Sequence, residues 1–162
     1  MSTNAPTKIY ADIQRNSLRP DEINVGDGLK PMSINLTPTI VTATAIASRD
    51  FMPVHHDKDY ARAHFAPDIF LNILSSNGYV ARFLTDWAGP ECWVKKISIK
   101  LGVPAVPHQV LKFTGTVLSK TTVGNECVIE VSVQAANNSG NHATGTAMIT
   151  LPCQEKHDGI NG

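Results

Sequence analysis

The sequence predicts an α+β domain in which one long, mostly buried helix lies on an antiparallel sheet. The segment from Asp68 to about Trp87 repeats apolar residues at helical spacing, in a stripe wide enough for burial. Residues 93–151 then alternate apolar and polar residues between turn signals, which is typical of strands. The chain has 162 residues, enough for one domain with its own core.

The N-terminal part predicts an arm followed by a first strand. Residues 1–24 are polar and lack periodicity, so we expect a loosely ordered arm. The domain is then expected over residues 25–152, and a polar tail over 153–162. Residues 25–28 read Val-Gly-Asp-Gly, a turn signal, and residues 30–36 alternate in part as a strand does.

Three helices are expected next. Thr37 followed by Pro38 is a helix start, and apolar residues continue at helical spacing to about Ser48. Asp57 is expected to cap a short helix that runs to about His64. In the long helix from Asp68, Gly78 costs about 1 kcal/mol relative to Ala, so we expect another element to pack closely against it.

Four strands are expected after that helix, over residues 93–101, 109–119, 126–135 and 143–151. The polar run 137–141 is a hairpin turn signal. We expect consecutive strands to pair, so that the four form a meander on which the helix lies.

Composition excludes several classes of protein. Lys and Arg total 14, as do Asp and Glu, so the basic excess of a nucleic-acid binder is missing. The three cysteines are far apart and form no zinc or disulfide pattern. No apolar run resembles a signal peptide or a membrane span, so a cytoplasmic location without membrane association is expected.

The segment Asp50–Asp57 is the strongest candidate for chemistry. It holds a carboxylate, a proline turn and two imidazoles in eight residues between helices. A turn can aim Asp50 and His55 at one water molecule, which each can bind. On spacing alone, a helix-terminating role for Asp50 and a core role for His55 are about equally good readings. Neighbouring side chains diverge in an extended turn, so His56 is expected to point elsewhere.

This layout resembles the hot-dog fold, in which a curved antiparallel sheet wraps a long central helix. The motif resembles that of the MaoC-like (R)-specific enoyl-CoA hydratases, Asp-x-Asn-Pro-x-His with a small residue further on. Asp50, Pro53 and His55 match, and Ala61 occupies the small position, whereas Met52 replaces the family's Asn. The resemblance implies that Asp50 and His55 are catalytic, without a metal or another cofactor beyond the coenzyme A of the substrate.

A second departure lies at the expected start of the long helix. Many family members carry His-Gly there, and the glycine N–H binds the thioester oxygen, whereas this chain has Phe70-Leu71. The Leu71 N–H could still donate, because this role needs no side chain. We assign Phe51, Phe70 and Asn72 to the substrate-binding wall.

Residues 30–151 more closely resemble the small catalytic subunit of actinobacterial steroid side-chain enoyl-CoA hydratases. The similarity lies in Asp50–Asp57 and in the runs 68–74 and 85–89. It implies a bulky enoyl-CoA substrate and a larger hot-dog subunit that lacks the catalytic pair, in an α2β2 assembly.

Three other functions stay open at this point. One is a hot-dog acyl-CoA thioesterase, which would not need the Asp-x-x-Pro-x-His turn. Another is a homodimeric (R)-specific hydratase of linear fatty enoyl-CoA. The third is a non-catalytic hot-dog subunit, which would have no need to keep both Asp50 and His55. Fold alone does not separate these functions.

Overall fold

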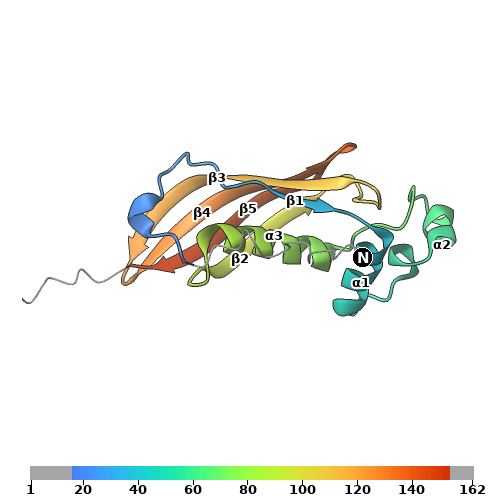
Figure 1. Ribbon diagram of the computed structural model, residues 1–162, viewed down its shortest axis with the longest axis horizontal. Coiled ribbons are helices and arrows are strands. Elements are labelled where there is room, and N and C mark those ends of the chain that lie inside the picture. Colours follow the sequence, from blue (N-terminus) through green and yellow to red (C-terminus); the bar gives the residue numbers. More distant parts are fainter. Residues whose placement is uncertain (1–15, 154–162) are drawn as a thin grey trace, which may run out of the picture.

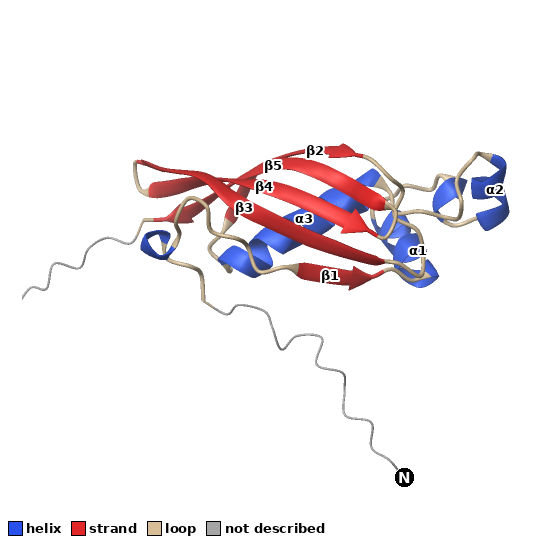
Figure 2. Ribbon diagram, turned by 90° about the horizontal axis from the view of Figure 1, so that it is seen from above, coloured by secondary structure: helices blue, strands red, loops and turns tan. Residues whose placement is uncertain are grey.

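The computed structural model describes residues 16–153 and confirms an α+β fold with a helix lying along one face of an antiparallel sheet (Figure 1). The elements are η1 (Pro20–Glu22), β1 (Met32–Asn35), α1 (Pro38–Ala47), η2 (Pro53–His55), α2 (Lys58–Ala63), α3 (Ile73–Ala88), β2 (Trp93–Leu101), β3 (Val110–Val123), β4 (Glu126–Asn137) and β5 (Gly140–Pro152). Figure 2 shows α3 running beneath the strands, with α1 and α2 beyond one end of the sheet.

The prediction of a four-strand meander is wrong for β2. The strand order is β1-β3-β4-β5-β2, so β2 pairs with β5 and only β3, β4 and β5 follow one another. The loop 102–109 therefore connects the β2 edge of the sheet to the other side, where β3 lies. Alternation within a strand reports which face is buried but not which strand is its neighbour, so the sequence pattern could not reveal this crossover.

The core lies between α3 and the sheet. Val80, Phe83 and Leu84 of α3 are each at most 1% exposed and belong to one cluster with residues of β3, β4 and β5. Buried and partly exposed residues alternate along β4, as expected for a sheet with one covered face. Within residues 16–153, no helix combines the length and apolarity needed to cross a membrane.

The two predicted caps before α3 are confirmed. The Thr37 hydroxyl accepts from the Ile40 N–H at 3.1 Å, and Pro38 occupies the first position of α1. The Asp57 carboxylate accepts from the Tyr60 N–H at 2.9 Å at the start of α2. These caps fix both helices that flank the motif.

The predicted start of the long helix at Asp68 is wrong by five residues. Helix α3 begins at Ile73, and the Asn72 side chain caps it by accepting from the Ser75 N–H at 2.9 Å. Residues 68–72 form a non-helical approach instead. An Asn cap satisfies a free amide of the first turn, whereas the apolar periodicity continued upstream and concealed the boundary.

The described end of the predicted arm packs against the domain. The Leu18 N–H donates to the Ala88 carbonyl at 2.8 Å, and Ile23 is 1% exposed. The Lys120 ammonium donates to the Ile23 carbonyl at 2.6 Å. The packed unit thus includes residues before the expected boundary at 25, while the arm's residues 1–15 and the tail's residues 154–162 lie outside the described range.

The expectation of close packing at Gly78 is also wrong. A Cβ added there would meet nothing within 4 Å.

We therefore expect Gly78→Ala to raise the free energy of unfolding by about 1 kcal/mol, the difference in helix propensity. Denaturant unfolding would measure this. Gly145→Ala is the matched control, because its Cβ would collide with the backbone of Ser98 and Ile99, and it should destabilise the fold.

Candidate active site

The C-terminus of α1 places Asp50. The Asp50 N–H donates to the Ala45 carbonyl at 2.9 Å and the Arg49 N–H to the Ile46 carbonyl at 3.0 Å, which together form a Schellman motif. Arg49 has φ of 59°, a left-handed conformation that costs a non-glycine residue about 1 kcal/mol. The helix end therefore fixes the direction in which the Asp50 carboxylate leaves the backbone.

The proline turn places His55. Residues Pro53–His55 form η2, and the His55 Nδ1 lies 2.7 Å from the Phe70 carbonyl oxygen. A carbonyl only accepts, so Nδ1 carries the proton and the neutral ring has its lone pair on Nε2. The Phe70 ring packs edge-on against His55 with centroids 5.0 Å apart, which restrains the imidazole further.

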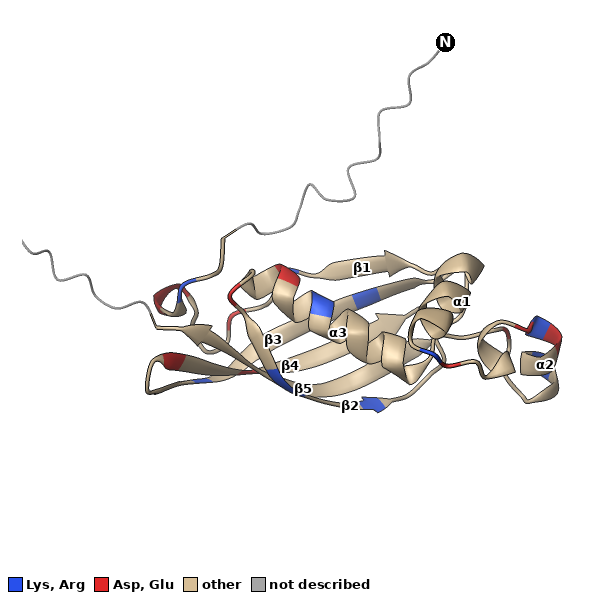
Figure 3. Ribbon diagram, turned by 90° about the horizontal axis from the view of Figure 1, so that it is seen from below, with Lys and Arg blue, Asp and Glu red and all other residues tan. Residues whose placement is uncertain are grey.

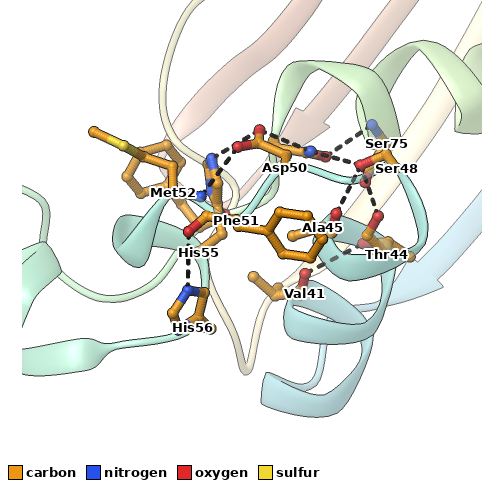
Figure 4. A network of polar contacts seen from close by, with 12 residues as sticks. Val41, Thr44, Ala45, Ser48, Asp50, Phe51, Met52, His55, His56 and Ser75 are labelled. Carbon is orange, nitrogen blue, oxygen red and sulfur yellow. Dashed lines mark hydrogen bonds and ion pairs between the residues drawn. The ribbon is translucent and has the colours of Figure 1, made fainter.

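Asp50 and His55 meet, as the sequence predicted. The His55 Nε2 lies 3.3 Å from Asp50 Oδ2, and the two side chains are 8% and 25% exposed (Figure 4). Both facing atoms are proton acceptors when the ring is neutral, so a water molecule that bonds to both is the arrangement that satisfies them. This is the geometry of a pair that holds and deprotonates water.

Asn72 holds the carboxylate in this position. Its amide nitrogen donates to Asp50 Oδ2 at 3.0 Å and to the Ser48 hydroxyl at 2.9 Å, while its oxygen caps α3. The bond from Asn72, with a lesser contribution from the Met52 N–H and, when its ring is protonated, from His55, holds the pKa of Asp50 below its usual value against the opposing effect of burial. Asp50 is therefore a carboxylate at neutral pH.

A cavity of about 320 Å³ opens in front of the pair. One wall comes from the end of α1, from η2 and from the approach to α3, and the other from the crossover loop after β2 and the start of β5. Its lining residues are Asp50, His55, Phe70, Leu71, Asn72, Ile73, Leu101, Gly102, Val103, Pro104 and His142. The crossover absent from the predicted meander thus supplies part of the wall opposite the pair, through Gly102, Val103 and Pro104.

The assignment of the Leu71 N–H to the thioester oxygen is wrong in this structure. That amide donates to the Ala105 carbonyl at 2.9 Å, so it is already used. The first free amides of α3 belong to Ile73 and Leu74, which find no acceptor within residues 16–153, as helix geometry leads one to expect. Of these two residues, Ile73 lines the cavity.

The other predicted residues separate into two groups. Phe70 and Asn72 line the cavity, although the Asn72 amide is occupied by Asp50 and Ser48. Phe51 is 66% exposed and is not among the lining residues. His56 points away from the pair, with Nε2 3.3 Å from the Phe51 carbonyl, as the alternation of neighbouring side chains predicted (Figure 4).

Charged groups lie mainly outside the cavity. Basic residues mark β2, one of the two edge strands of the sheet (Figure 3). One of them, Lys95, pairs with Glu126 at 3.2 Å on the exposed surface, where charged side chains protect a sheet edge from pairing with other chains. Across residues 16–153, no three His, Cys, Asp or Glu side chains gather as metal ligands would.

Ser48 and His142 belong to the site but were not found by sequence reasoning. Ser48 accepts from Asn72, and His142 lines the cavity from β5. His142 has no partner pattern in the sequence, because the groups around it come from α3 and the crossover loop. For Asn72, the sequence did carry a signal of its role as the cap of α3, because Asn is a preferred residue at the start of a helix.

Loss of the Asn72 side chain should change the acidity of Asp50. In Asn72→Ala we expect the pKa of Asp50 to rise, because the hydrogen bond that most lowers it is removed. The fold should lose about 1 kcal/mol with the helix cap. Carboxyl ¹³C NMR titration would measure the first effect and denaturant unfolding the second. Asn77→Ala, which removes a side-chain bond to the Ile73 carbonyl on the same helix, should leave the Asp50 titration unchanged.

Comparison with known proteins agrees with this geometry. The chain is 41% identical over 127 residues to the 3-oxo-4,17-pregnadiene-20-carboxyl-CoA hydratase beta subunit of Mycobacterium tuberculosis, covering 78% of this chain and 95% of that protein. A chain in the crystal structure of the ChsH1-ChsH2 complex from the same organism superposes with a TM-score of 0.74 at 40% identity, covering 79% of this chain and 98% of that one. No protein-family model matches this chain.

A more distant structure supports the fold. The R-hydratase PhaJ1 of Pseudomonas aeruginosa superposes with a TM-score of 0.75 at 20% identity, covering 85% of this chain and 88% of that one. The predicted resemblance to the hot-dog hydratases is therefore confirmed. This chain belongs to the MaoC-like hydratase family of hot-dog fold that includes the beta subunit from Mycobacterium tuberculosis.

Proposed function

We propose that this protein is the catalytic subunit of an enoyl-CoA hydratase that adds water across the α,β double bond of a bulky, steroid side-chain enoyl-CoA. The observation that carries the proposal is the pair of proton acceptors, Asp50 Oδ2 and His55 Nε2, 3.3 Å apart at the mouth of a cavity. Two acceptors that share a cavity with a residue whose helix amide is free, Ile73, suit the addition of water to a conjugated thioester.

Water is bound and deprotonated by the pair. Its two hydrogens bond to Asp50 Oδ2 and His55 Nε2, which leaves an oxygen lone pair for attack on Cβ. As the C–O bond forms, one proton passes to the pair and the π electrons move toward the thioester oxygen. Cα then receives a proton from the pair, so the substrate gains the elements of one water molecule.

Negative charge on the thioester oxygen is stabilised at the start of α3. The Ile73 N–H takes the role first assigned to Leu71, because it lies at the first position of the helix and is free. The positive end of the helix dipole adds to this effect. Phe70 and Leu71 contribute to the wall and to the orientation of His55.

Two features support a wide acyl group. The relative from Mycobacterium tuberculosis is named as a subunit of a hydratase of 3-oxo-4,17-pregnadiene-20-carboxyl-CoA, a steroid thioester. A second hollow of about 340 Å³ lies between α1 and α3, where Ser48, Leu74 and Gly78 are among its lining residues. Ser48 accepts a hydrogen bond from Asn72, which lines the first cavity, so a single side-chain contact links the walls of the two spaces. The acyl group would extend along this apolar surface.

A second hot-dog subunit would complete the site. Strand β2 ends the sheet and pairs within residues 16–153 with β5 alone, and an open edge invites pairing with another chain. Apolar residues beside the pair are also exposed, at 66% for Phe51 and 51% each for Met52, Ile73 and Leu74. The solved ChsH1-ChsH2 complex favours a heteromeric partner, and we propose an α2β2 assembly.

Asp50→Ala and His55→Ala should each lower the rate of hydration by at least about a hundredfold, the range for general acid–base groups. His56→Ala, the matched control, should have little effect, because His56 contacts the Phe51 carbonyl rather than the pair. Loss of the conjugated thioester absorbance measures hydration, and a thiol reagent measures release of coenzyme A. Thiol release by the wild type without hydration would identify a thioesterase and contradict the proposal.

The assembled protein should hydrate a ring-bearing enoyl-CoA faster than crotonyl-CoA. The exposed apolar residues beside the pair and the hollow between α1 and α3 offer a surface on which a rigid ring system can pack. A four-carbon chain is too short to reach this surface. Both substrates would be assayed with the chain alone and with the partner subunit present, and sedimentation would give the stoichiometry. A fully active monomer would contradict the proposed need for a partner subunit. A preference for crotonyl-CoA would contradict the steroid assignment.

A further inference from the structure

His142 is a buried histidine for which the proposed chemistry has no role. It lies near the start of β5, is 2% exposed and lines the same cavity as Asp50 and His55. Its Nδ1 lies 2.8 Å from the Val103 carbonyl oxygen, and its Nε2 lies 2.9 Å from the Ser76 hydroxyl. Both ring nitrogens are thus bound by protein groups, so the ring is not free to take a proton from a substrate.

The proton on this ring can be placed from its partners. The Val103 carbonyl only accepts, so Nδ1 carries a hydrogen. Burial lowers the pKa of His142, although the bond to Val103 opposes this, and the ring is neutral at pH 7. Nε2 is then an acceptor, and the Ser76 hydroxyl supplies the hydrogen. The ring therefore ties the first turn of α3 to the crossover loop.

Ser76 links this tie to the catalytic carboxylate. Its N–H donates to the Asn72 carbonyl at 3.0 Å; its hydroxyl oxygen also lies 3.0 Å from that carbonyl, but its one hydrogen goes to His142, so the backbone N–H makes the bond to Asn72. Asn72, itself 2% exposed, donates from its side chain to Asp50. A continuous set of buried contacts thus runs from His142 through Ser76 and Asn72 to Asp50.

We propose that His142 is a positioning residue that acts through Ser76 and Asn72 to hold the Asp50 carboxylate in the orientation required for water addition. Its catalytic consequence rests on the proposed hydratase function, whereas its effect on Asp50 does not. An error of about 1 Å in a reacting group can cost about a hundredfold in rate, so a tie that holds Asn72 is expected to matter for turnover.

The acidity of Asp50 reports on this tie. Among described residues that line the cavity with Asp50, the other titratable groups are His55 from η2 and His142 from β5. The neighbours Ser48 and Asn72 are neutral. The Asn72 bond is the main cause that lowers the pKa of Asp50. If the first turn of α3 moves, this bond lengthens and the pKa rises. A loss of packing that leaves Asn72 in place has no such effect.

The test compares Ser76→Ala, His142→Leu and His142→Gln in the full chain, in the assembly in which it purifies. Carboxyl ¹³C NMR, with the Asp50 signal assigned through Asp50→Asn, follows the titration of Asp50 directly. We expect the pKa of Asp50 to rise in Ser76→Ala and His142→Leu, and kcat for the ring-bearing enoyl-CoA to fall about tenfold or more. KM should change little in Ser76→Ala. The Gln variant should restore both readouts, because its amide oxygen can accept from Ser76.

Thr150→Val is the matched control, since Thr150 is a buried polar residue toward the other end of β5, at 3% exposed. It should leave the Asp50 titration unchanged. If His142→Leu does not fold, Ser76→Ala decides the question, because it removes only one hydroxyl. An unchanged Asp50 pKa in folded Ser76→Ala would overturn the inference, as would a Gln variant as impaired as Leu. If the wild type hydrates no enoyl-CoA but the pKa of Asp50 still rises in Ser76→Ala, the positioning of Asp50 is upheld and the proposed function is rejected.

Discussion

The site depends on the hydrogen bonds made by the side chain of Asn72. One amide group caps α3, binds Ser48 at the end of α1 and binds the Asp50 carboxylate. It therefore joins the two helices at the point where the catalytic turn leaves one and the cavity meets the other. A buried amide whose hydrogens and oxygen are all paired has little freedom to rotate, and this rigidity passes to Asp50.

Met52 stands where the motif of the wider MaoC-like family has an Asn, and the structure indicates how the turn persists without it. The Met52 N–H donates to Asp50 Oδ1 at 3.3 Å, and the His55 N–H donates to the Met52 carbonyl at 3.1 Å. The backbone of Met52 thus serves the turn, while its side chain is 51% exposed. Asn72, Phe70 and the Schellman motif before Asp50 hold the rest of the geometry from outside the turn.

Local signals could be predicted from the sequence, and contacts across the fold could not. The caps at Thr37 and Asp57, the strand at 93–101 and the meeting of Asp50 with His55 all follow from patterns within a few residues. The pairing of β2 with β5, and the crossover from β2 to β3 that it requires, depend on how the sheet closes over α3, which alternation does not encode. The Leu71 amide was misassigned for the same reason, since its acceptor, Ala105, lies on the crossover loop.

That crossover has a chemical consequence. The loop after β2 takes the Leu71 amide and the His142 ring as partners, through Ala105 and Val103. It therefore occupies the amide that a His-Gly pair would present and leaves Ile73 as the first free amide in the cavity. A free amide at the first position of the helix lies at the positive end of the aligned backbone dipoles, which is why we propose it as the donor to the thioester oxygen. The loop that crosses from β2 to β3 therefore also determines which amide at the start of α3 is left for the proposed oxyanion role.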